Sequence, residues 1–366
     1  MTRGDFGTTR LAKTASELDL PLDDVVILLA CNELFVPYLS VALQSISEHA
    51  SPERRYDVVV LSSNLSDESM RTLHAQVTRS NFGIGFLDAM AALGEIKLPR
   101  HGHFACETYY RLLAPEMLDH VDKAIYMDSD LVVLCDLAEL YDTDVTGYLL
   151  AATRDADTAG QCAGYDAAIL PYLRDEVGLE DPYGYFQAGV LVMNLEEFRR
   201  LHPAGRSIEI AASKHWHWLD QDVLNLLAKG DYYRLDTSWN TLMDWQHLRR
   251  SHIVAQAPEA IRREYDVARA NPRVVHYAGP DDRPWLYPRC DMGEYFWDFA
   301  SRSPYHDELQ RRLRASWRTP QGLLKRLQVF ALFKIGMPAV DFLLPPGTRR
   351  RAAIIAGYKK LGGNLM

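Results

Sequence analysis

Residues 25–47 read VVILLACNELFVPYLSVALQSIS, and they indicate the fold class of the whole chain. The first six residues are all apolar, as in a strand that is buried on both faces of a sheet. From Val36 onward, the apolar residues Leu39, Leu43 and Ile46 recur at helical spacing. The segment therefore predicts a buried strand that is followed directly by a helix.

The same unit of strand and helix recurs along the chain. Residues 56–61 predict a second strand, a helix follows from about Ser66, and residues 84–87 predict a third strand. We expect further strands over 123–128, 149–153, 186–193 and 274–277, and helices over 166–177, 195–200, 220–229 and 294–300. Such alternation predicts a mainly parallel, Rossmann-like sheet that is covered by helices and binds its ligand beyond the carboxyl ends of the strands. A GxGxxG turn does not follow the first strand, which disfavours a dinucleotide cofactor.

Composition divides the chain into three parts. Residues 1–24 are polar and Thr-rich and should form a loose N-terminal arm, residues 25–305 should form the catalytic domain, and residues 306–366 are basic and amphipathic. The net charge is −9, but twelve Lys or Arg against one acid from Leu309 onward give that region +11, which leaves −20 for residues 1–308. The acidic body argues against nucleic acid as a partner, whereas the basic region suits an anionic surface.

The expected location follows from segments that the sequence lacks. No apolar run reaches the ~18 residues of a spanning helix, and the N-terminus lacks the apolar stretch of a signal peptide. The five cysteines form no CxxC pair, as in a reducing compartment. Because residues 306–366 interleave basic and apolar side chains, as interfacial helices do, we expect a cytoplasmic protein that is peripheral on the inner face of the cell membrane. The alternative is that this region packs on the acidic catalytic domain.

The triplet Asp128-Ser129-Asp130 ends an apolar strand and is the most informative chemical motif. Residues two apart in an extended chain point to the same side, so both carboxylates project together while Ser129 faces away. Two carboxylates this close repel each other unless a cation lies between them. Oxygen ligands at the mouth of a sheet suit Mg²⁺ or Mn²⁺, which would in turn hold a diphosphate. The alternative is a solvated turn or a helix cap.

His276 follows another apolar strand, within the sequence VVHYAG of residues 274–279. Beside the two carboxylates, an imidazole would complete a mixed oxygen and nitrogen site typical of Mn²⁺ rather than Ca²⁺. Gly279 would let backbone amides approach an anion, and Arg283 can bind phosphate oxygens through its planar guanidinium. The alternatives are a core histidine and a surface arginine.

Two motifs place polar side chains near the start of helices. Arg111 precedes the strand that ends in the triplet of residues 128–130. It is either an ion-pair partner of the two carboxylates of that triplet or a charge on a helix surface. The sequence Asp-Gln-Asp over 220–222 opens a helix, where a cap at Asp220 and the helix dipole would explain both acids. They would not explain Gln221.

A third motif, Gln-Ala-Gly over residues 187–189, precedes a long apolar strand. The side-chain amide of Gln187 is followed by two small residues at the start of the strand. The alternative is a site of close packing between backbone segments.

Six blocks of sequence occur in the order and spacing of glycosyltransferase family 8. They are residues 30–39 (ACNELFVPYL), 108–112 (TYYRL), 126–131 (YMDSDL), 185–195 (YFQAGVLVMNL), 219–225 (LDQDVLN) and 276–280 (HYAGP). The chain resembles the bacterial lipopolysaccharide glucosyl- and galactosyltransferases of that family, with glycogenin as a more distant relative. The resemblance covers about residues 24–305, and six ordered blocks are far more specific than any one alone.

The resemblance implies an α/β fold of the GT-A type, with a Rossmann-like mixed sheet flanked by helices and a basic helical C-terminal appendage. It also implies Mn²⁺, with Mg²⁺ as the alternative, bound by Asp128, Asp130 and His276. At matching positions the resemblance also implies a donor site. The uracil would be surrounded by Ala30, Asn32 and Phe35, and the ribose or donor sugar by Arg111, Gln187, Ala188 and Asp220. Gln221 would lie beneath the anomeric carbon, Gly279 and Arg283 would lie near the diphosphate, and Ser129 and Gly189 belong to the same motifs. Asn32, Gln187 and Arg283 depart from the Asp, Asn and Lys that are usual there.

The implied function is retaining transfer of a hexose, glucose or galactose, from a UDP-sugar to a saccharide or glycolipid acceptor in cell-surface glycan synthesis. Gln221 and Asp220 are the implied catalytic residues. An amide is a weak nucleophile, which favours a same-face displacement over a double displacement through Gln221. Two alternatives are a metal-dependent nucleotidyltransferase and a non-catalytic, membrane-associated protein that binds nucleotide sugars. The first would ordinarily carry a Gly- and Arg-rich loop where this chain has CNELF.

Overall fold

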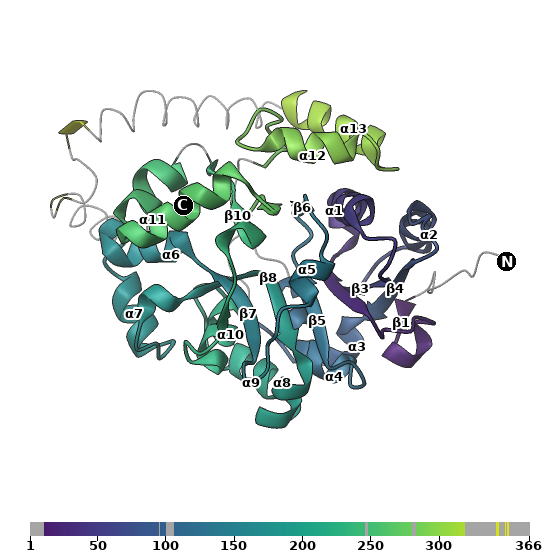
Figure 1. Ribbon diagram of the computed structural model, residues 1–366, viewed down its shortest axis with the longest axis horizontal. Coiled ribbons are helices and arrows are strands. Elements are labelled where there is room, and N and C mark those ends of the chain that lie inside the picture. The colour runs from purple at the N-terminus through teal and green to yellow at the C-terminus, as the bar shows by residue number, and fades with distance from the viewer. Residues whose placement is uncertain are drawn as a thin grey trace.

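The computed structural model describes residues 11–94, 96–99, 106–245, 248–279, 283–318, 342, 343, 348 and 350. Its strands are β1 (Leu11–Ala12), β2 (Val25–Ala30), β3 (Tyr56–Ser62), β4 (Phe82–Asp88), β5 (Lys123–Met127), β6 (Leu131–Val133), β7 (Leu150–Arg154), β8 (Phe186–Asn194), β9 (Tyr233–Arg234), β10 (Thr241–Leu242) and β11 (Val274–His276). Figure 1 shows them as a central layer with helices on both sides.

The α-helices account for most of the covering layers. They are α1 (Val36–His49), α2 (Asp67–Gln76), α3 (Ala89–Leu93), α4 (Ala114–Met117), α5 (Ala138–Tyr141), α6 (Ala156–Gly160), α7 (Ile169–Asp175), α8 (Leu195–Leu201), α9 (Arg206–Ser213), α10 (Asp220–Ala228), α11 (Glu259–Ala270), α12 (Gly293–Ala300) and α13 (His306–Arg318). Shorter helical segments are η1 (Ala15–Glu17), η2 (Glu33–Phe35), η3 (Cys106–Leu113), η4 (Gln161–Tyr165), η5 (Pro182–Gly184), η6 (Thr237–Asn240), η8 (Arg249–Ile253) and η9 (Val254–Gln256). No helix in the described ranges is both long and apolar enough to cross a bilayer.

The main sheet changes from parallel to antiparallel pairing at β5. Its strand order is β1-β4-β3-β2-β5-β8-β7-β9. From β1 to β5 all neighbours are parallel, whereas β8 runs antiparallel to both β5 and β7. The end of β5 therefore lies beside the beginning of β8, and residues from both can face one crevice. The predicted mixed α/β sheet is confirmed.

Strand β2 shows why its apolar run is buried on both faces. Val26 and Leu28 belong to one apolar core, which lies under η3, α4 and α8–α10. Ile27 and Leu29 belong to the other core, under α1, α2 and α5. Every residue from Val25 to Leu29 has at most 1% of its surface exposed. Alternate side chains of one continuous apolar strand thus hold both helical layers to the sheet.

A second, three-stranded sheet lies next to the end of β5. Its order is β10-β11-β6, with β11 antiparallel to β6 and parallel to β10. Only residues 128–130 separate the end of β5 from the start of β6. The small sheet therefore places His276, at the end of β11, close to the end of β5 in the main sheet. Strands of two or three residues are too short to show a periodic pattern of apolar residues, so a second sheet was not predicted from the sequence.

The described part of the N-terminal arm is packed rather than loose. Residues 11–24 contribute β1, which adds to the edge of the main sheet beside β4. Leu18 is fully buried and lies with Leu20 over Gly83 and Gly85 of β4, where small residues leave room. The expectation of a loose arm is wrong for these residues, because their scattered leucines complete the sheet edge.

The predicted C-terminal region begins with α13, which packs beside α12 and α1 (Figure 1). Leu309 is fully buried in an apolar cluster with residues of α1 and α12. The further basic and apolar residues on which the membrane prediction rests, over 319–341 and 351–366, lie outside the described residues.

Candidate functional site

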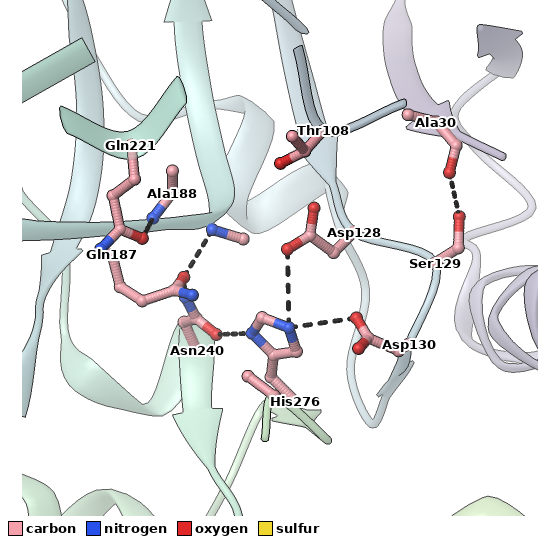
Figure 2. A network of polar contacts seen from close by, with 12 residues as sticks. Ala30, Thr108, Asp128, Ser129, Asp130, Gln187, Ala188, Gln221, Asn240 and His276 are labelled. Atoms are coloured by element: carbon pink, nitrogen blue, oxygen red, sulfur yellow. Dashed lines mark hydrogen bonds and ion pairs between the residues drawn. The ribbon is translucent and has the colours of Figure 1, made fainter. Parts of the chain in front are cut away.

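The site lies where β5 ends and β8 begins. Asp128 follows the last residue of β5, and its backbone N–H donates to the carbonyl of Gly189 near the start of β8 at 2.9 Å. The Oγ of Ser129 donates to the carbonyl of Ala30 at the end of β2, 2.6 Å away. These bonds fix the triplet at the carboxyl ends of two parallel strands, as the sequence predicts, with Ser129 turned away from its flanking carboxylates (Figure 2).

Two carboxylates and an imidazole meet at this point. Nε2 of His276 lies 3.2 Å from Oδ1 of Asp130 and 3.6 Å from Oδ2 of Asp128. One ligand atom from each of the three residues lies within 4.8 Å of the others. His276 reaches this position because β11 pairs His276 with Leu131, directly after the triplet. The donor set of two carboxylates and one imidazole fits a divalent cation such as Mn²⁺ or Mg²⁺.

Gly189 allows the imidazole and the carboxylate to approach the backbone of β8. A Cβ atom at this position would lie 2.3 Å from Cε1 of His276 and 2.9 Å from Oδ2 of Asp128. Both distances are shorter than van der Waals contact, so any larger residue would displace one of the two side chains. The site needs glycine here because of space and not because of backbone conformation.

Asn240 and Gln187 form a second layer behind His276 (Figure 2). Nδ1 of His276 donates to Oδ1 of Asn240 at 2.9 Å, and Nδ2 of Asn240 donates to Oε1 of Gln187 at 2.5 Å. Oε1 of Gln187 also accepts from the N–H of Gly189 at 2.5 Å. The chain of hydrogen bonds fixes the plane of the imidazole and directs Nε2 toward the two carboxylates.

Arg111 is a buried charge that joins two predicted site residues. Its guanidinium lies 2.8 Å from Oδ1 of Asp128 and 2.8 Å from Oδ2 of Asp220. It also lies over the ring of Tyr126, 4.2 Å from the centroid, and donates to the carbonyl of Ala188. Only 3% of Arg111 is exposed, so the reading as a surface charge is wrong. Burial acts to lower its pKa, but the two carboxylates outweigh burial and raise the pKa of Arg111.

Asp220 is the first residue of α10 rather than its cap, which is Leu219. The carboxylate of Asp220 accepts from Oγ1 of Thr108 at 2.5 Å and faces the guanidinium of Arg111. Burial raises the pKa of Asp220 to about 6, against the lowering effects of Arg111 and Thr108. A helix-cap role therefore does not explain Asp220, whose carboxylate points into the cavity region.

Gln221 is held on two sides next to Asp220. Its Oε1 accepts from the N–H of Ala188 at 2.9 Å, and its Nε2 donates to Oδ2 of Asp155 at 3.3 Å. Burial and the neighbouring carboxylate of Asp157 raise the pKa of Asp155 to about 6. The amide of Gln221 is thus fixed in orientation between a strand and a buried acid.

On the opposite side, Asn32 and Phe35 form a short helical turn after β2. Oδ1 of Asn32 accepts from the N–H of Phe35 at 3.2 Å and so caps η2. The ring of Phe35 meets that of Tyr38 edge-on, with centroids 5.3 Å apart. Of the two polar ends of the Asn32 amide, the oxygen is therefore engaged by the backbone, and the nitrogen is the end that can face a ligand.

Arg283 neutralises the second carboxylate of the triplet. Its Nη1 lies 3.0 Å from Oδ2 of Asp130, and its Nε donates to the carbonyl of Gly279 at 2.9 Å. Burial acts to raise the pKa of Asp130, but Arg283 and His276 outweigh it, so that the pKa lies below its usual value. Arg283 is a partly enclosed cation at the triplet and not an isolated surface charge.

Every site residue predicted from the sequence lines one cavity of about 330 Å³. The residues are Ala30, Asn32, Phe35, Arg111, Asp128, Ser129, Asp130, Gln187, Ala188, Gly189, Asp220, Gln221, His276, Gly279 and Arg283. A cavity of this size is within the range of small-molecule sites. Tyr126, Asp155 and Arg249, which are not among the predicted site residues, also line it. Tyr126 lies within a quoted block, so the block itself carries a signal for it.

Several known proteins are similar to this chain in sequence or in fold. The model of the family "Glycosyl transferase family 8" matches residues 26–288. General stress protein A of Bacillus subtilis is 23% identical over 297 residues, which cover 78% of this chain and 92% of that protein. The lipopolysaccharide 1,2-glucosyltransferase of Escherichia coli is 25% identical over 211 residues, or 56% of each chain. A crystal structure of the galactosyltransferase LgtC with donor and acceptor sugar analogues has a TM-score of 0.60 and 26% identity, over 76% of this chain and 96% of that chain. The expected GT-A type of fold is confirmed.

Proposed function

Since the chain belongs to glycosyl transferase family 8, we propose that it transfers glucose or galactose from a UDP-sugar to a saccharide or glycolipid acceptor, with retention of the anomeric configuration. The similarity to a lipopolysaccharide glucosyltransferase and to a galactosyltransferase supports both candidate sugars and a cell-surface glycan as the product. The observation that carries the proposal is the cluster of Asp128, Asp130 and His276 on the wall of the cavity.

Mn²⁺ is the proposed metal, and Mg²⁺ is the alternative. Asp128, Asp130 and His276 would hold it, because a mixed set of carboxylate and imidazole ligands suits these ions. When bound, the ion supplies positive charge to the diphosphate leaving group as a Lewis acid. Arg283, 3.0 Å from Asp130, supplies a second cation on the same side of the cavity.

The other residues would hold the donor. The ring of Phe35 and the amide nitrogen of Asn32 would contact the uracil, since they lie together at the end of β2. Asp220 would accept hydrogen bonds from sugar hydroxyls, because its carboxylate faces the cavity beside Arg111. The stacked side chains of Arg111 and Tyr126 line the same cavity, and exclusion of water from the developing oxocarbenium ion there would favour transfer over hydrolysis.

Gln221 would stabilise positive charge at the anomeric carbon through its fixed side-chain oxygen. We favour a same-face displacement, in which the bond from the anomeric carbon to the phosphate oxygen breaks as the acceptor oxygen bonds to that carbon. The departing phosphate oxygen then takes the acceptor's proton. A neutral amide is a weak nucleophile, which disfavours a covalent intermediate on Gln221. Its Oε1 is also engaged by the N–H of Ala188 at 2.9 Å, which reduces its nucleophilicity further.

The test is incubation of the full chain with Mn²⁺ and either UDP-glucose or UDP-galactose. In this reaction water takes the hexose, so release of UDP with the α-anomer as the first-formed free sugar in time-resolved NMR, before mutarotation, supports the proposal. Asp128→Asn and Asp130→Asn should lower turnover by at least ~10²-fold, while Asp119→Asn, whose side chain is 80% exposed, serves as the control. Pyrophosphate release from UTP and a sugar phosphate would instead indicate a nucleotidyltransferase. Binding of UDP-sugar without any turnover would indicate a non-catalytic binding protein.

We further propose that the enzyme works at the inner face of the membrane, held there by its basic C-terminal region. A glycolipid acceptor would be present at that surface. Twelve basic residues from Leu309 onward are the support for this part of the proposal.

A further inference from the structure

Helix α13 contacts the rest of the chain through a fully buried leucine. Leu309 is fully buried and belongs to an apolar cluster that includes Val41 of α1, Phe296 of α12, and Trp285 from the segment before α12. Figure 1 shows α13 beside α12, with both lying over α1. Leu309 therefore determines which face of α13 meets the domain, and a residue three positions further along lies on the same face.

Arg312 is that residue, and it contacts the turn that carries Phe35. Its Nη1 donates to the carbonyl of Leu34 at 2.7 Å, and its Nε donates to Oε1 of Glu308 at 2.8 Å. The guanidinium also lies 5.8 Å from the ring centroid of Tyr38. Leu34 is the middle residue of η2, so Arg312 binds the backbone of η2 from outside the cavity.

Tyr38, which Arg312 contacts, in turn contacts two further aromatic residues. Its ring meets Phe35 edge-on at 5.3 Å and stacks on Trp285 at 4.2 Å. Trp285 lies 5.4 Å from the guanidinium of Arg283, which pairs with the carboxylate of Asp130. One aromatic ring thus touches Phe35, which is proposed to contact the uracil, and Trp285, which lies next to the proposed diphosphate residue Arg283.

We propose that Arg312 is a positioning residue for the nucleotide: it holds η2 and Tyr38 so that Phe35 is set to stack on the base. The inference rests on the proposed function, because it concerns the same donor site. The turn is otherwise held by the cap from Asn32 and by Glu33, whose carboxylate accepts hydrogen bonds from Ser66 and Ser69 of the neighbouring helix α2 and its cap. The hydrogen bond from Arg312 to Leu34 supplies an additional constraint from an element almost 280 residues away in the chain.

Arg311 provides a matched control on the same helix. It pairs with the same carboxylate, Glu308, at 2.7 Å, and its side chain is 73% exposed against 33% for Arg312. Arg311→Met and Arg312→Met remove the same charge and the same kind of bond to Glu308. Only Arg312→Met also removes the donor to Leu34.

The first test is calorimetry of UDP with Mn²⁺ present, together with the kinetics of UDP-sugar hydrolysis. Arg312→Met should raise the Kd of UDP and the KM for the donor roughly 3- to 10-fold, the worth of one hydrogen bond, and leave kcat unchanged. Arg312→Lys should recover most of the affinity, since an ammonium can still donate to the carbonyl of Leu34. Equal Kd values for Arg312→Met and Arg311→Met would overturn the inference.

The second test needs no nucleotide and separates this inference from the proposed function. Hydrogen exchange of the amides over 32–38 should be faster in Arg312→Met than in Arg311→Met, because the turn loses its outer constraint. If the wild-type chain does not bind UDP, the proposed function fails, and equal exchange in the two variants would refute the positioning role by itself. Should Arg312→Met not fold, Arg312→Gln carries the same comparison.

Discussion

Nδ1 of His276 lies 2.9 Å from Oδ1 of Asn240, and both side chains are almost completely buried. The hydrogen bond places the imidazole proton on Nδ1 and leaves Nε2 as the atom that faces Asp128 and Asp130. Asn240 also donates to Gln187, so the orientation of its amide is fixed from both ends. A residue with no ligand role of its own thus determines which nitrogen of His276 can bind a metal.

The first prediction concerns Asn240. Asn240→Ala should weaken Mn²⁺ binding roughly 10- to 100-fold, because the imidazole loses the partner that fixes its orientation and its protonated nitrogen. Asn240→Asp keeps an acceptor for Nδ1 and should restore most of the affinity. Titration calorimetry with Mn²⁺ alone measures both, and unchanged affinity in Asn240→Ala would contradict the assignment.

The second prediction concerns Gly189. Gly189→Ala places a methyl group 2.3 Å from Cε1 of His276, so either the imidazole or Asp128 must move. We expect turnover to fall by ~10²-fold, the cost of misplacing a catalytic group by about 1 Å. Gly184→Ala is the control, because its Cβ would lie 3.7 Å from the nearest atom, in ordinary contact. Equal activity of the two variants would show that the site tolerates the shift.

The third prediction concerns pH and Asp155. Its buried carboxyl has a pKa of about 6 in the folded chain, above the ordinary value near 3.9, with Asp157, Arg249 and Gln221 facing it. A raised pKa favours the folded state at low pH, and this stabilisation is lost as pH rises from about 4 through about 6. The free energy of unfolding of Asp155→Asn, relative to that of wild type, should therefore increase by ~3 kcal/mol as the pH rises from about 4 to about 6.

Chemical unfolding of both chains at each pH measures this difference. Asp119→Asn, with an exposed side chain, is measured in parallel as the control. A constant difference for Asp155→Asn would mean that the buried carboxyl ionises as it does in the unfolded chain.

The fourth prediction concerns the base. UDP should bind at least about 10-fold more tightly than GDP or ADP, because the amide of Asn32 can bond to the uracil edge. Phe35→Ala should weaken UDP by roughly 5- to 100-fold through loss of stacking. Leu34→Ala, whose side chain is 72% exposed in the same turn, should leave the affinity unchanged. Tighter binding of a purine nucleotide in calorimetry would reject the assignment.

The fifth prediction concerns the C-terminal region. The full chain should sediment with anionic vesicles but not with neutral ones, and about 0.5 M NaCl should release much of it, since the attraction is screened within a few ångströms at that ionic strength. Truncation after Arg318 keeps the packed helix α13 and removes most of the basic residues, so it should abolish binding. Equal binding to both kinds of vesicle, or retention after truncation, would refute the anchor.

The sequence predicts those parts of the fold that depend on long apolar runs. The strand over 25–30 and the helix that follows it are present because burial on both faces of a sheet requires an uninterrupted apolar run. Residues 11–24 were harder to interpret, since Leu18 and Leu20 pack on glycines of β4 that are distant in the chain. Packing of this kind has no local period.

Some residues of the site can be predicted from the sequence, and others cannot. The triplet around Ser129 and His276 at the end of β11 can be found from motifs at strand ends, because ligands of such sheets bind beyond the carboxyl ends of the strands. Asn240 cannot be found in this way, because it lies in a short turn without a motif and meets His276 across two-residue and three-residue strands. The pairing that makes Asn240 important exists only in three dimensions.

The pairing of β6 with β11 has a consequence for the order in which the protein matures on the ribosome. β6 follows the carboxylates directly, but its neighbour β11 is made more than 140 residues later. Folding proceeds from the N-terminus as synthesis advances. Until the segment around His276 emerges from the exit tunnel, the two carboxylates lack their third ligand and β6 lacks its partner strand. The proposed metal site of the nascent chain is therefore completed only late, after the strands of the main sheet have been synthesised.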